Sequence, residues 1–473
     1  MTAWLDPVRP YAIAHRGASA YAPGNTLRAF DLASDLGSDF WEIDIRTSGD
    51  GLLVAHHDAT TASGLSIAAT AADTLSEDCE TPSLDAIIAL AMQRGAGLYA
   101  DIKDANPVAV ADAFRNAGLE KAILGAFDPA DVAALKAAGV TYPNAALVPL
   151  GADPFVHAAG ADIIHLCWER MERPQDMLTP DFLAKAAAAG QRIILWHEED
   201  PDRMAELRNL PILGICSDTP ELVHPFRAPA VWPVKTVAHR GANSVAPENT
   251  LPAASCAFAA GFDWVELDVR TSVDGQLVVI HDAAVDRTTD GTGLVVDKPM
   301  SDLRALDAGG WFAPHFAGVR LPTLTEMLDC AQAWGRGIYI EIKHGDAVAV
   351  LREVQLAEMV DRCFFWSWDY EGLRAIKAAD SRARIMTRRM DFDRLEDCFA
   401  GLSPDIIEYD STDDWSDMEA ARGYGAKLMI CYMGRDPDVL DRVIAARPDI
   451  VNTDDLFTFR RRMEAAGLAT HGT

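Results

Sequence analysis

The chain places acidic residues at alternate positions inside strongly apolar runs. Within residues 264–269, Glu266 and Asp268 stand two positions apart among apolar neighbours. Alternate residues of a strand share one face, so the two carboxylates are expected to point the same way. Two neighbouring buried carboxylates repel each other, and each is costly to desolvate without compensation. A salt bridge at a solvated strand end is one form of compensation, and a bound cation is another.

A second apolar run repeats this pattern and adds a third acid. Within residues 338–343, Glu341 and Lys343 share a face of another predicted strand. Three gathered carboxylates have the hard-oxygen character that suits Mg²⁺ or Ca²⁺. Zinc or iron more often recruits histidine or cysteine into its ligand set.

Two histidines and two basic side chains complete this set of reactive residues. His239 and His281 each end an apolar run, where a barrel strand delivers a functional side chain. Two histidines can divide acid and base duties near neutral pH. Arg240 and Lys343 would supply charge-assisted hydrogen bonds to an anion such as a phosphate diester. With a cation, this set indicates attack at phosphorus.

The same set of residue types occurs earlier in the chain, in the same order. The first half contains His15, Arg16, Glu42, Asp44, His57, Asp101 and Lys103. A repeat of this length indicates a duplicated domain, because solenoid units are much shorter. We predict one domain over residues 1–225 and another over 234–473. A proline-rich linker over 226–233 is expected to join them.

The elements that must position these residues alternate between strands and helices. In the second half, short apolar runs alternate with Ala-rich helical stretches, which predicts βα units and a parallel sheet. There are nine apolar runs, one more than an eight-stranded barrel needs. The dipeptide Asp274-Gly275, which stands between two of the runs, is typical of a hairpin turn. Residues 277–280 are therefore expected to fold back on 264–269. The predicted fold is α/β, with two tandem (β/α)8 TIM barrels; an open doubly wound sheet is the alternative.

Composition limits the classes of partner. The 473 residues carry 71 acidic and 42 basic side chains, giving a formal net charge of −29. Such a chain is expected to avoid nucleic acid and anionic membrane surfaces, and to take a small-molecule partner. No apolar run approaches the roughly 20 residues that span a bilayer. The start of the chain has no signal-peptide pattern and the eight cysteines are widely spaced, so we expect a cytoplasmic protein with reduced thiols. The oligomeric state is left open.

The ordered motifs of the second half resemble the glycerophosphodiester phosphodiesterase family. The first half resembles it more weakly. The motifs that carry the resemblance are His239-Arg240-Gly241, Pro247-Glu248-Asn249-Thr250, Glu266-x-Asp268, Asp274-Gly275, His281-Asp282, Arg287-Thr288-Thr289, Leu321-Pro322-Thr323-Leu324 and Glu341-Ile342-Lys343.

The resemblance implies a TIM barrel that splits a glycerophosphodiester into glycerol 3-phosphate and an alcohol. In the second half it implies that His239 and His281 form an acid–base pair. It implies that the basic side chains of Arg240 and Lys343 bind the phosphate. The implied ligands of a divalent metal ion are Glu266, Asp268 and Glu341. The matching positions of the first half are His15 with His57, Arg16 with Lys103, and Glu42 with Asp44 and Asp101. It also implies a small cap over 282–320, where Trp311 and Phe312 either face the substrate or pack within the cap.

The first half departs from the second in three ways. It lacks counterparts of residues 287–289 and 309–312, so its cap is expected to be shortened. It has Gly24 in place of Glu248. It has Asp101 in place of Glu341, which shortens the reach by about 1.5 Å, a loss that a water ligand could absorb.

Two hypotheses follow from the duplication. In the first, the second half is the main metal-dependent phosphodiesterase and the first half is a weak or altered copy. In the second, the first half is a non-catalytic phosphoester-binding or structural partner. A sugar or lysolipid phosphodiester is an alternative substrate. The nucleophile is either water or the glycerol 2-hydroxyl, and the residues leave open which histidine acts first as base.

Overall fold

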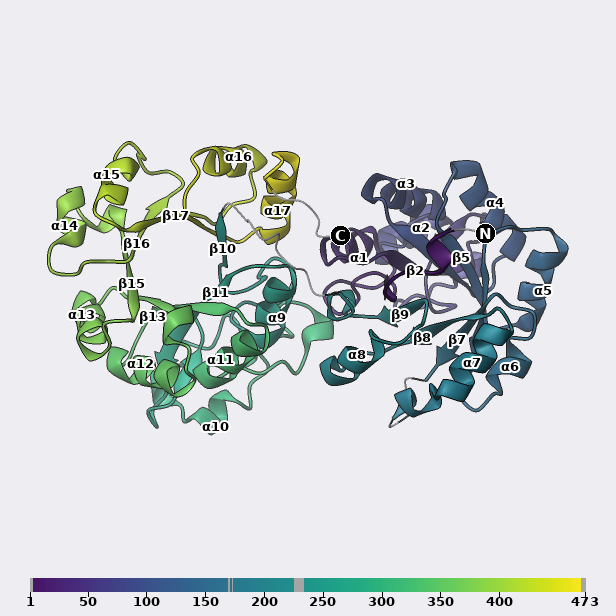
Figure 1. Ribbon diagram of the computed structural model, residues 1–473, viewed down its shortest axis with the longest axis horizontal. Coiled ribbons are helices and arrows are strands. Elements are labelled where there is room, and N and C mark those ends of the chain that lie inside the picture. The colour runs from purple at the N-terminus through teal and green to yellow at the C-terminus, as the bar shows by residue number, and fades with distance from the viewer. Residues whose placement is uncertain (1–2, 169–170, 172, 225–233, 469–473) are drawn as a thin grey trace. The chain divides into compact units, whose positions relative to one another are not determined.

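The chain divides into two compact units, each with strands at its centre and helices around them (Figure 1). The units are Met1–Pro225 and Phe226–Thr473. The computed structural model describes residues 3–168, 171, 173–224 and 234–468. The linker predicted at 226–233 lies outside the described residues.

The first unit is a closed parallel barrel. Its strands follow the order β1-β9-β8-β7-β6-β5-β4-β2-β3, and β1 also pairs with β2. This additional pairing closes the parallel strands into a ring, with β3 antiparallel to β2 outside it. The described strands are β1 (Tyr11–Ala14), β2 (Phe40–Thr47), β3 (Leu53–Ala55), β4 (Gly97–Ile102), β5 (Ala122–Ala126), β6 (Asn144–Val148), β7 (Ile163–Cys167), β8 (Arg192–Trp196) and β9 (Gly214–Ser217).

The second unit repeats this topology, in the order β10-β18-β17-β16-β15-β14-β13-β11-β12 with β10 also paired to β11. Its described strands are β10 (Lys235–Ala238), β11 (Trp264–Thr271), β12 (Leu277–Val279), β13 (Gly337–Ile342), β14 (Phe364–Trp366), β15 (Arg384–Arg388), β16 (Ile406–Asp410), β17 (Lys427–Tyr432) and β18 (Ile450–Thr453). Strand β12 runs antiparallel to β11, as the hairpin prediction required. The predicted fold of two tandem TIM barrels is confirmed, and the open-sheet alternative is excluded by the closing pairs.

Most helices of both units connect successive strands, while η1 precedes β1, η4 follows β9 and α17 follows β18. In the first unit they are η1 (Ala3–Leu5), α1 (Leu27–Asp35), η2 (Ile67–Ala69), α2 (Ala72–Cys79), α3 (Leu84–Arg94), α4 (Pro107–Ala117), α5 (Pro129–Ala137), α6 (Pro154–His157), η3 (Pro174–Met177), α7 (Pro180–Ala188), α8 (Pro201–Leu207) and η4 (Pro220–Leu222). In the second unit they are α9 (Leu251–Ala259), η5 (Val295–Asp297), α10 (Met300–Leu303), η6 (Pro314–Phe316), α11 (Leu324–Ala333), α12 (Ala347–Leu356), η7 (Val360–Arg362), α13 (Tyr370–Ala379), η8 (Arg389–Asp391), α14 (Leu395–Phe399), α15 (Met418–Gly423), α16 (Pro437–Ala445) and α17 (Leu456–Ala465).

Local sequence explains where several of these helices begin. The side chains of Thr26 and Thr250 accept hydrogen bonds from backbone N–H groups in the first turns of α1 and α9. Thr323 and Glu326 form a reciprocal capping box at the start of α11. Each cap satisfies an N–H group that has no partner within the helix.

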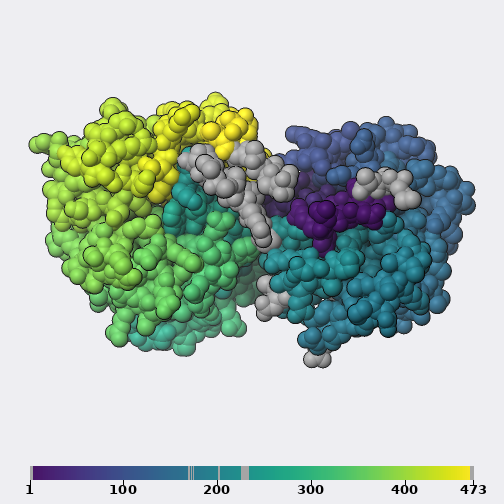
Figure 2. All heavy atoms as spheres, in the orientation of Figure 1, coloured from purple at the N-terminus to yellow at the C-terminus, as the bar shows by residue number. Residues whose placement is uncertain are grey.

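The start of the chain packs against the first barrel. Figure 2 shows this segment, in purple, at the surface of the first unit. Trp4 and Leu5 of η1 contact the barrel core, where the Trp4 and Phe40 ring centroids lie 5.4 Å apart. Tyr11 donates its hydroxyl hydrogen to the Trp4 carbonyl over 2.8 Å. Residues that precede β1 therefore contribute to the core of this barrel.

The segment after the β11–β12 hairpin forms a small cap on the second barrel. It contains η5, α10 and η6 around an apolar cluster that includes Val285, Val295 and Leu303. The corresponding segment of the first unit contains η2 and α2 around a smaller cluster that includes Ile67 and Leu75. The expected shortening of the first cap therefore leaves a small packed element in its place. Among the described residues, no helix combines the length and apolarity needed to traverse a bilayer.

Candidate active site

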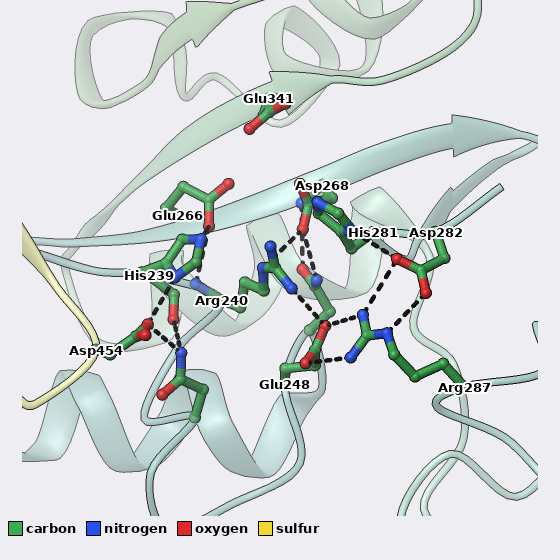
Figure 3. A network of polar contacts seen from close by, with 12 residues as sticks. His239, Arg240, Glu248, Glu266, Asp268, His281, Asp282, Arg287, Glu341 and Asp454 are labelled. Carbon is green, nitrogen blue, oxygen red and sulfur yellow. Dashed lines mark hydrogen bonds and ion pairs between the residues drawn. The ribbon is translucent and has the colours of Figure 1, made fainter. Parts of the chain in front are cut away.

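Three buried carboxylates from two adjacent strands meet in the second unit. Glu266 and Asp268 lie on β11, and Glu341 lies on β13 directly opposite Asp268 in the parallel register. One carboxylate oxygen from each residue lies within 4.8 Å of the other two. All three side chains are buried. The structure therefore brings the three predicted acids together, as Figure 3 shows.

The trio has the chemistry of a cation site. Oε1 of Glu266 is buried and accepts no hydrogen bond from the described residues. Burial and the neighbouring Asp268 carboxylate raise the pKa of Glu266 well above its ordinary value. Lys343 compensates part of the charge, because its Nζ lies 3.3 Å from Asp268 Oδ1 and also pairs with Glu341. The Arg240 guanidinium also approaches the trio, with its Nε 3.5 Å from Asp268 Oδ2, but it is shared with Glu248. The three carboxylates therefore keep a net negative charge, and a divalent cation fits that charge and the unsatisfied oxygen.

Both predicted histidines of this unit are held by carboxylates through Nδ1. His239 follows β10, and its Nδ1 lies 2.6 Å from Asp454 Oδ1. His281 follows β12, and its Nδ1 lies 2.6 Å from Asp282 Oδ1. A carboxylate at Nδ1 fixes the proton there and leaves Nε2 for chemistry. Nε2 of His239 lies 4.0 Å from Glu266 Oε2, so it is next to the cation site.

Burial lowers the pKa of His281 below its ordinary value, although the nearby Asp268 and Asp282 carboxylates oppose the shift. The imidazole of His281 is therefore biased toward its neutral form, which can accept a proton. Asp282 itself has a lowered pKa because Arg287 donates hydrogen bonds to it. It stays ionised and available to His281 at neutral pH.

The backbone around Arg240 explains the His-Arg-Gly motif. Arg240 has a left-handed φ of 55°, and its N–H donates to Glu266 Oε2 over 2.8 Å. Gly241 follows with φ of 81°, and a Cβ there would lie 2.7 Å from the carbonyl carbon of Ala253 in α9. Only glycine allows the turn to pack this closely on the helix. The motif therefore aims one backbone donor and one guanidinium at the acidic trio.

The Pro-Glu-Asn-Thr motif supports the same site, with a different role for each polar residue. Asn249 donates to Asp268 Oδ2 over 2.7 Å and accepts from the Asp268 N–H over 3.1 Å. Glu248 Oε1 lies 2.9 Å from Arg240 Nη1. Thr250 caps α9. These contacts hold the Asp268 carboxylate and the Arg240 side chain in place.

Arg287 of the cap joins two of these groups. Its guanidinium makes two hydrogen bonds of 2.8 Å to Glu248 and one of 2.7 Å to Asp282 (Figure 3). The carboxylate that holds His281 is thus connected to the carboxylate that holds Arg240. Paired Arg–carboxylate contacts of this kind give geometric definition as well as energy.

The aromatic residues of the cap pack mainly on one another. The ring of Phe312 meets Trp311 edge-on at 5.7 Å and Phe316 edge-on at 5.7 Å. Trp311 donates its Nε1 hydrogen to the Ala308 carbonyl over 2.9 Å. These contacts match packing within the cap for Phe312, whereas Trp311 is 41% exposed and both expectations for it stay predictions.

The first unit reproduces the central geometry. Carboxylate oxygens of Glu42, Asp44 and Asp101 lie within 4.8 Å of one another, and all three residues are buried. The shorter Asp101 side chain therefore joins the cluster, although its reach was expected to be reduced. Burial raises the pKa of Asp101 to about 6. Lys103 lies 2.6 Å from Asp101 Oδ2 and 3.1 Å from Asp44 Oδ1.

The remaining predicted residues of the first unit also occupy matching places. His15 Nδ1 lies 2.7 Å from Asp218 Oδ1, and His57 Nδ1 lies 2.8 Å from Asp58 Oδ1. The N–H of Arg16 donates to Glu42 over 2.9 Å. Gly24 provides no carboxylate, so Arg16 lacks the second acidic partner that Glu248 gives Arg240. The first unit keeps the cluster but lacks the Arg–Glu–Arg connection to its cap.

Sequence reasoning missed the acids that hold the histidines from the last strand. Asp218 follows β9 and Asp454 follows β18, so both lie at the carboxyl end of a barrel strand. In a TIM barrel this end carries the functional residues. A polar residue directly after the last predicted strand was therefore an available signal.

Comparison with known proteins identifies the family of the chain. The model of the glycerophosphoryl diester phosphodiesterase family matches residues 15–78 and 239–456. The chain belongs to this family. Its membership makes it a phosphoric diester hydrolase, as the sequence predicted.

Relatives in this family match parts of the chain. A glycerophosphodiester phosphodiesterase from Caldanaerobacter subterraneus is 32% identical over 238 residues, covering 46% of this chain and 93% of the relative. A putative glycerophosphodiester phosphodiesterase from Bacillus subtilis, YhdW, is 46% identical over 119 residues, which is 25% of this chain and 49% of the relative. The crystal structure of a glycerophosphodiester phosphodiesterase from Agrobacterium tumefaciens superimposes with a TM-score of 0.46 at 36% identity, covering 48% of this chain and 99% of that structure.

Proposed function

We propose that the second unit hydrolyses glycerophosphodiesters to glycerol 3-phosphate and an alcohol, with a divalent cation bound by Glu266, Asp268 and Glu341. The observation that carries the proposal is the position of His239 beside this trio, with its Nδ1 held by Asp454 and its Nε2 4.0 Å from Glu266. Mg²⁺ and Ca²⁺ both suit three carboxylates. When bound, the cation supplies positive charge that stabilises the non-bridging oxygens of the phosphate.

In the proposed reaction His239 and His281 exchange protons with the substrate. One imidazole Nε2 accepts the proton of the attacking hydroxyl, from water or from the glycerol 2-hydroxyl. Attack by water gives glycerol 3-phosphate directly, whereas attack by the 2-hydroxyl gives a cyclic phosphate that water then opens to glycerol 3-phosphate. The other donates a proton to the oxygen of the departing alcohol. Asp454 and Asp282 stabilise the imidazolium forms from the Nδ1 side.

Arg240 and Lys343 are proposed to bind the phosphate. Both carry donors at the edge of the acidic trio, since Arg240 Nε lies 3.5 Å from Asp268 Oδ2 and Lys343 Nζ lies 3.3 Å from Asp268 Oδ1. Glu248 holds Arg240 from the other side. Positively charged hydrogen-bond donors that already lie where negative charge develops on the phosphate stabilise the transition state. They lower the activation barrier because the site does not have to rearrange during the reaction.

For the first unit we propose a weaker or altered site with the same roles for His15 and His57, for Arg16 and Lys103, and for Glu42, Asp44 and Asp101. A specific observation favours its alternative role as a phosphoester-binding or structural partner. Gly24 leaves Arg16 without the carboxylate that holds Arg240 in the second unit. The cytoplasmic location expected from the sequence stays a prediction.

The test is release of glycerol 3-phosphate by the full chain, with and without a chelator. Variants His281→Ala and His57→Ala remove one predicted acid–base residue from each unit. We expect chelator-sensitive activity that His281→Ala abolishes and His57→Ala leaves largely intact. Metal-independent release, or full activity of His281→Ala, would contradict the proposal. Loss of activity in His57→Ala alone would assign catalysis to the first unit.

A further inference from the structure

A second group of polar and aromatic side chains lies beside the acidic trio of the second barrel. Trp366 ends β14 and lies directly opposite Glu341 in the parallel register. Arg388 ends the next strand, β15, opposite Glu408 of β16. The proposed catalytic groups come from β10 to β13 and from the residue after β18. The strands β14 to β17 therefore form the part of the barrel mouth that the proposed reaction leaves unassigned, and Trp366 and Arg388 end two of them.

Arg388 is held on two indole rings. Its guanidinium carbon lies 5.1 Å from the ring centroid of Trp366 and 5.1 Å from that of Trp368. The two rings meet edge to face with centroids 5.0 Å apart. Trp366 is buried, whereas Trp368 is 62% exposed. A guanidinium on aromatic rings keeps its charge and has a defined orientation.

The acceptors around Arg388 leave most of its donor capacity for a ligand. The nearest carboxylate oxygen, Glu408 Oε1, lies 3.7 Å from Nε. Nη2 donates to the thioether sulfur of Met390 over 2.8 Å, and a thioether is a weak acceptor. Asp391 also acts on Arg388 electrostatically, but it accepts a hydrogen bond from Tyr370. Among the described residues, no carboxylate forms a close paired contact with the terminal amino groups.

The first barrel supplies an internal comparison at the same register positions. Gly125 of the first barrel corresponds to Trp366, because it lies opposite Asp101 as Trp366 lies opposite Glu341. Leu147 corresponds to Arg388, because it lies opposite His165 as Arg388 lies opposite Glu408. A Cβ at Gly125 would lie 2.6 Å from the Tyr99 ring, so an indole has no room there. The two barrels thus share the acids and histidines but differ in this group.

We propose that Arg388, supported by Trp366 and Trp368, selects phosphodiesters whose leaving alcohol carries an anionic group such as a carboxylate. This inference rests on the proposed function of the second unit. A planar guanidinium with available N–H groups recognises a carboxylate through paired hydrogen bonds. A cationic alcohol is disfavoured, because Arg388 already occupies the indole surface that would bind a quaternary ammonium.

The experiment compares three synthetic diesters of glycerol 3-phosphate that differ only at the end of a two-carbon arm. The arms end in a carboxylate (3-hydroxypropanoate), a carboxamide (3-hydroxypropanamide) or a trimethylammonium group (choline). Release of glycerol 3-phosphate is measured in a His57→Ala background, so that the second unit supplies the rate. Arg388→Leu copies the residue of the first barrel, and Arg388→Lys keeps the charge without the planar fork.

We expect kcat/KM to follow the order carboxylate, carboxamide, trimethylammonium. Arg388→Leu should lower the value for the carboxylate arm by about tenfold or more, the loss expected for a charge-assisted contact. It should leave the carboxamide arm within about threefold and raise the trimethylammonium arm. Arg388→Lys should restore part of the carboxylate preference. Thermal melts of each variant check that the fold is intact.

Two results would overturn the inference while leaving the proposed function standing. One is hydrolysis of all three diesters by the parent at similar kcat/KM. The other is an equal change for all three diesters in Arg388→Leu, which would make Arg388 a general binding or structural residue. Failure to hydrolyse any of the three diesters in the parent, together with inactivity toward other glycerophosphodiesters, would instead refute the proposed function and this inference with it.

Discussion

The Nδ1 atom of His239 lies 2.6 Å from Oδ1 of Asp454, although 215 residues separate the two along the chain. The contact exists because β10 pairs with β18, so the first and last strands of the barrel end side by side. Asn243 also donates to Asp454 Oδ1, over 2.5 Å. Closure of the barrel thereby positions an acid–base residue.

We predict that Asp454→Asn lowers kcat with little change in KM. Without the carboxylate, the imidazolium form of His239 is less stable and its ring is less well held. The expected decrease in kcat is about ten- to a hundredfold, which is part of the rate enhancement that general acid–base catalysis supplies. Asp218→Asn in the first unit is the matched control and should change neither kcat nor KM. An unchanged kcat in Asp454→Asn would show that the contact is only structural.

The same closure explains what could be predicted from the sequence and what could not. Glu266 and Asp268 were found because strand periodicity is local, and two acids in an apolar run conflict with burial. The hairpin at Asp274-Gly275 was found because its turn chemistry is local too. The role of Asp454 depends on which strands become neighbours. Its recognition required the closed barrel.

Arg388 was overlooked for a different reason. At the end of a strand it has the appearance of an ordinary surface arginine, and Trp366 has that of a core residue. Only the register of three adjacent strands places them together beside Glu341. The pairing of Glu248 with Arg287 likewise depends on how the cap folds back. Residues with long-range partners were therefore the ones that sequence reasoning missed.

We predict that Glu248→Gln lowers kcat/KM by about tenfold, the effect of losing charge-assisted contacts worth roughly 1.4 kcal/mol. Glu248 accepts from both Arg240 and Arg287, so its neutralisation leaves two guanidinium groups close together and less well held. Steady-state kinetics measure the change. Glu326→Gln is the control, because it weakens a comparable pair between Glu326 of α11 and Arg304 of the cap. Equal kinetic effects of the two variants would argue against a specific role of Glu248.

We predict that Mg²⁺ or Ca²⁺ raises the melting temperature of the second unit and that Glu266→Gln removes this effect. In chelator, the same variant should melt higher than the parent, because it relieves repulsion among three buried carboxylates. Differential scanning calorimetry with and without cation measures both quantities. Glu42→Gln is the matched variant for the first unit. A cation-induced shift that persists undiminished in the Glu266→Gln, Glu42→Gln double variant would mean that the ion binds elsewhere.

The last prediction concerns the stability of the first unit rather than its chemistry. Glu221 in η4 is buried, and its carboxylate accepts a hydrogen bond from the Tyr21 hydroxyl. Burial raises its pKa from 4.5 to about 7. The folded chain therefore binds more protons at this site than the unfolded chain between these two values. The free energy of unfolding must fall as pH rises through that interval, and the loss is complete above it.

Glu221→Gln should abolish this dependence. The glutamine carries no charge at any pH, so the variant should melt above the parent at pH 8 and close to it at pH 5. The difference in unfolding free energy at pH 8 is at most about 3.5 kcal/mol, from about 1.4 kcal/mol per unit of pKa shift. Calorimetric melts of the first unit across pH 5 to 8 measure it. Glu77→Gln, at an exposed position of the same unit, is the control and should track the parent. A parallel pH dependence in the parent and Glu221→Gln would show that folding does not raise the pKa of Glu221.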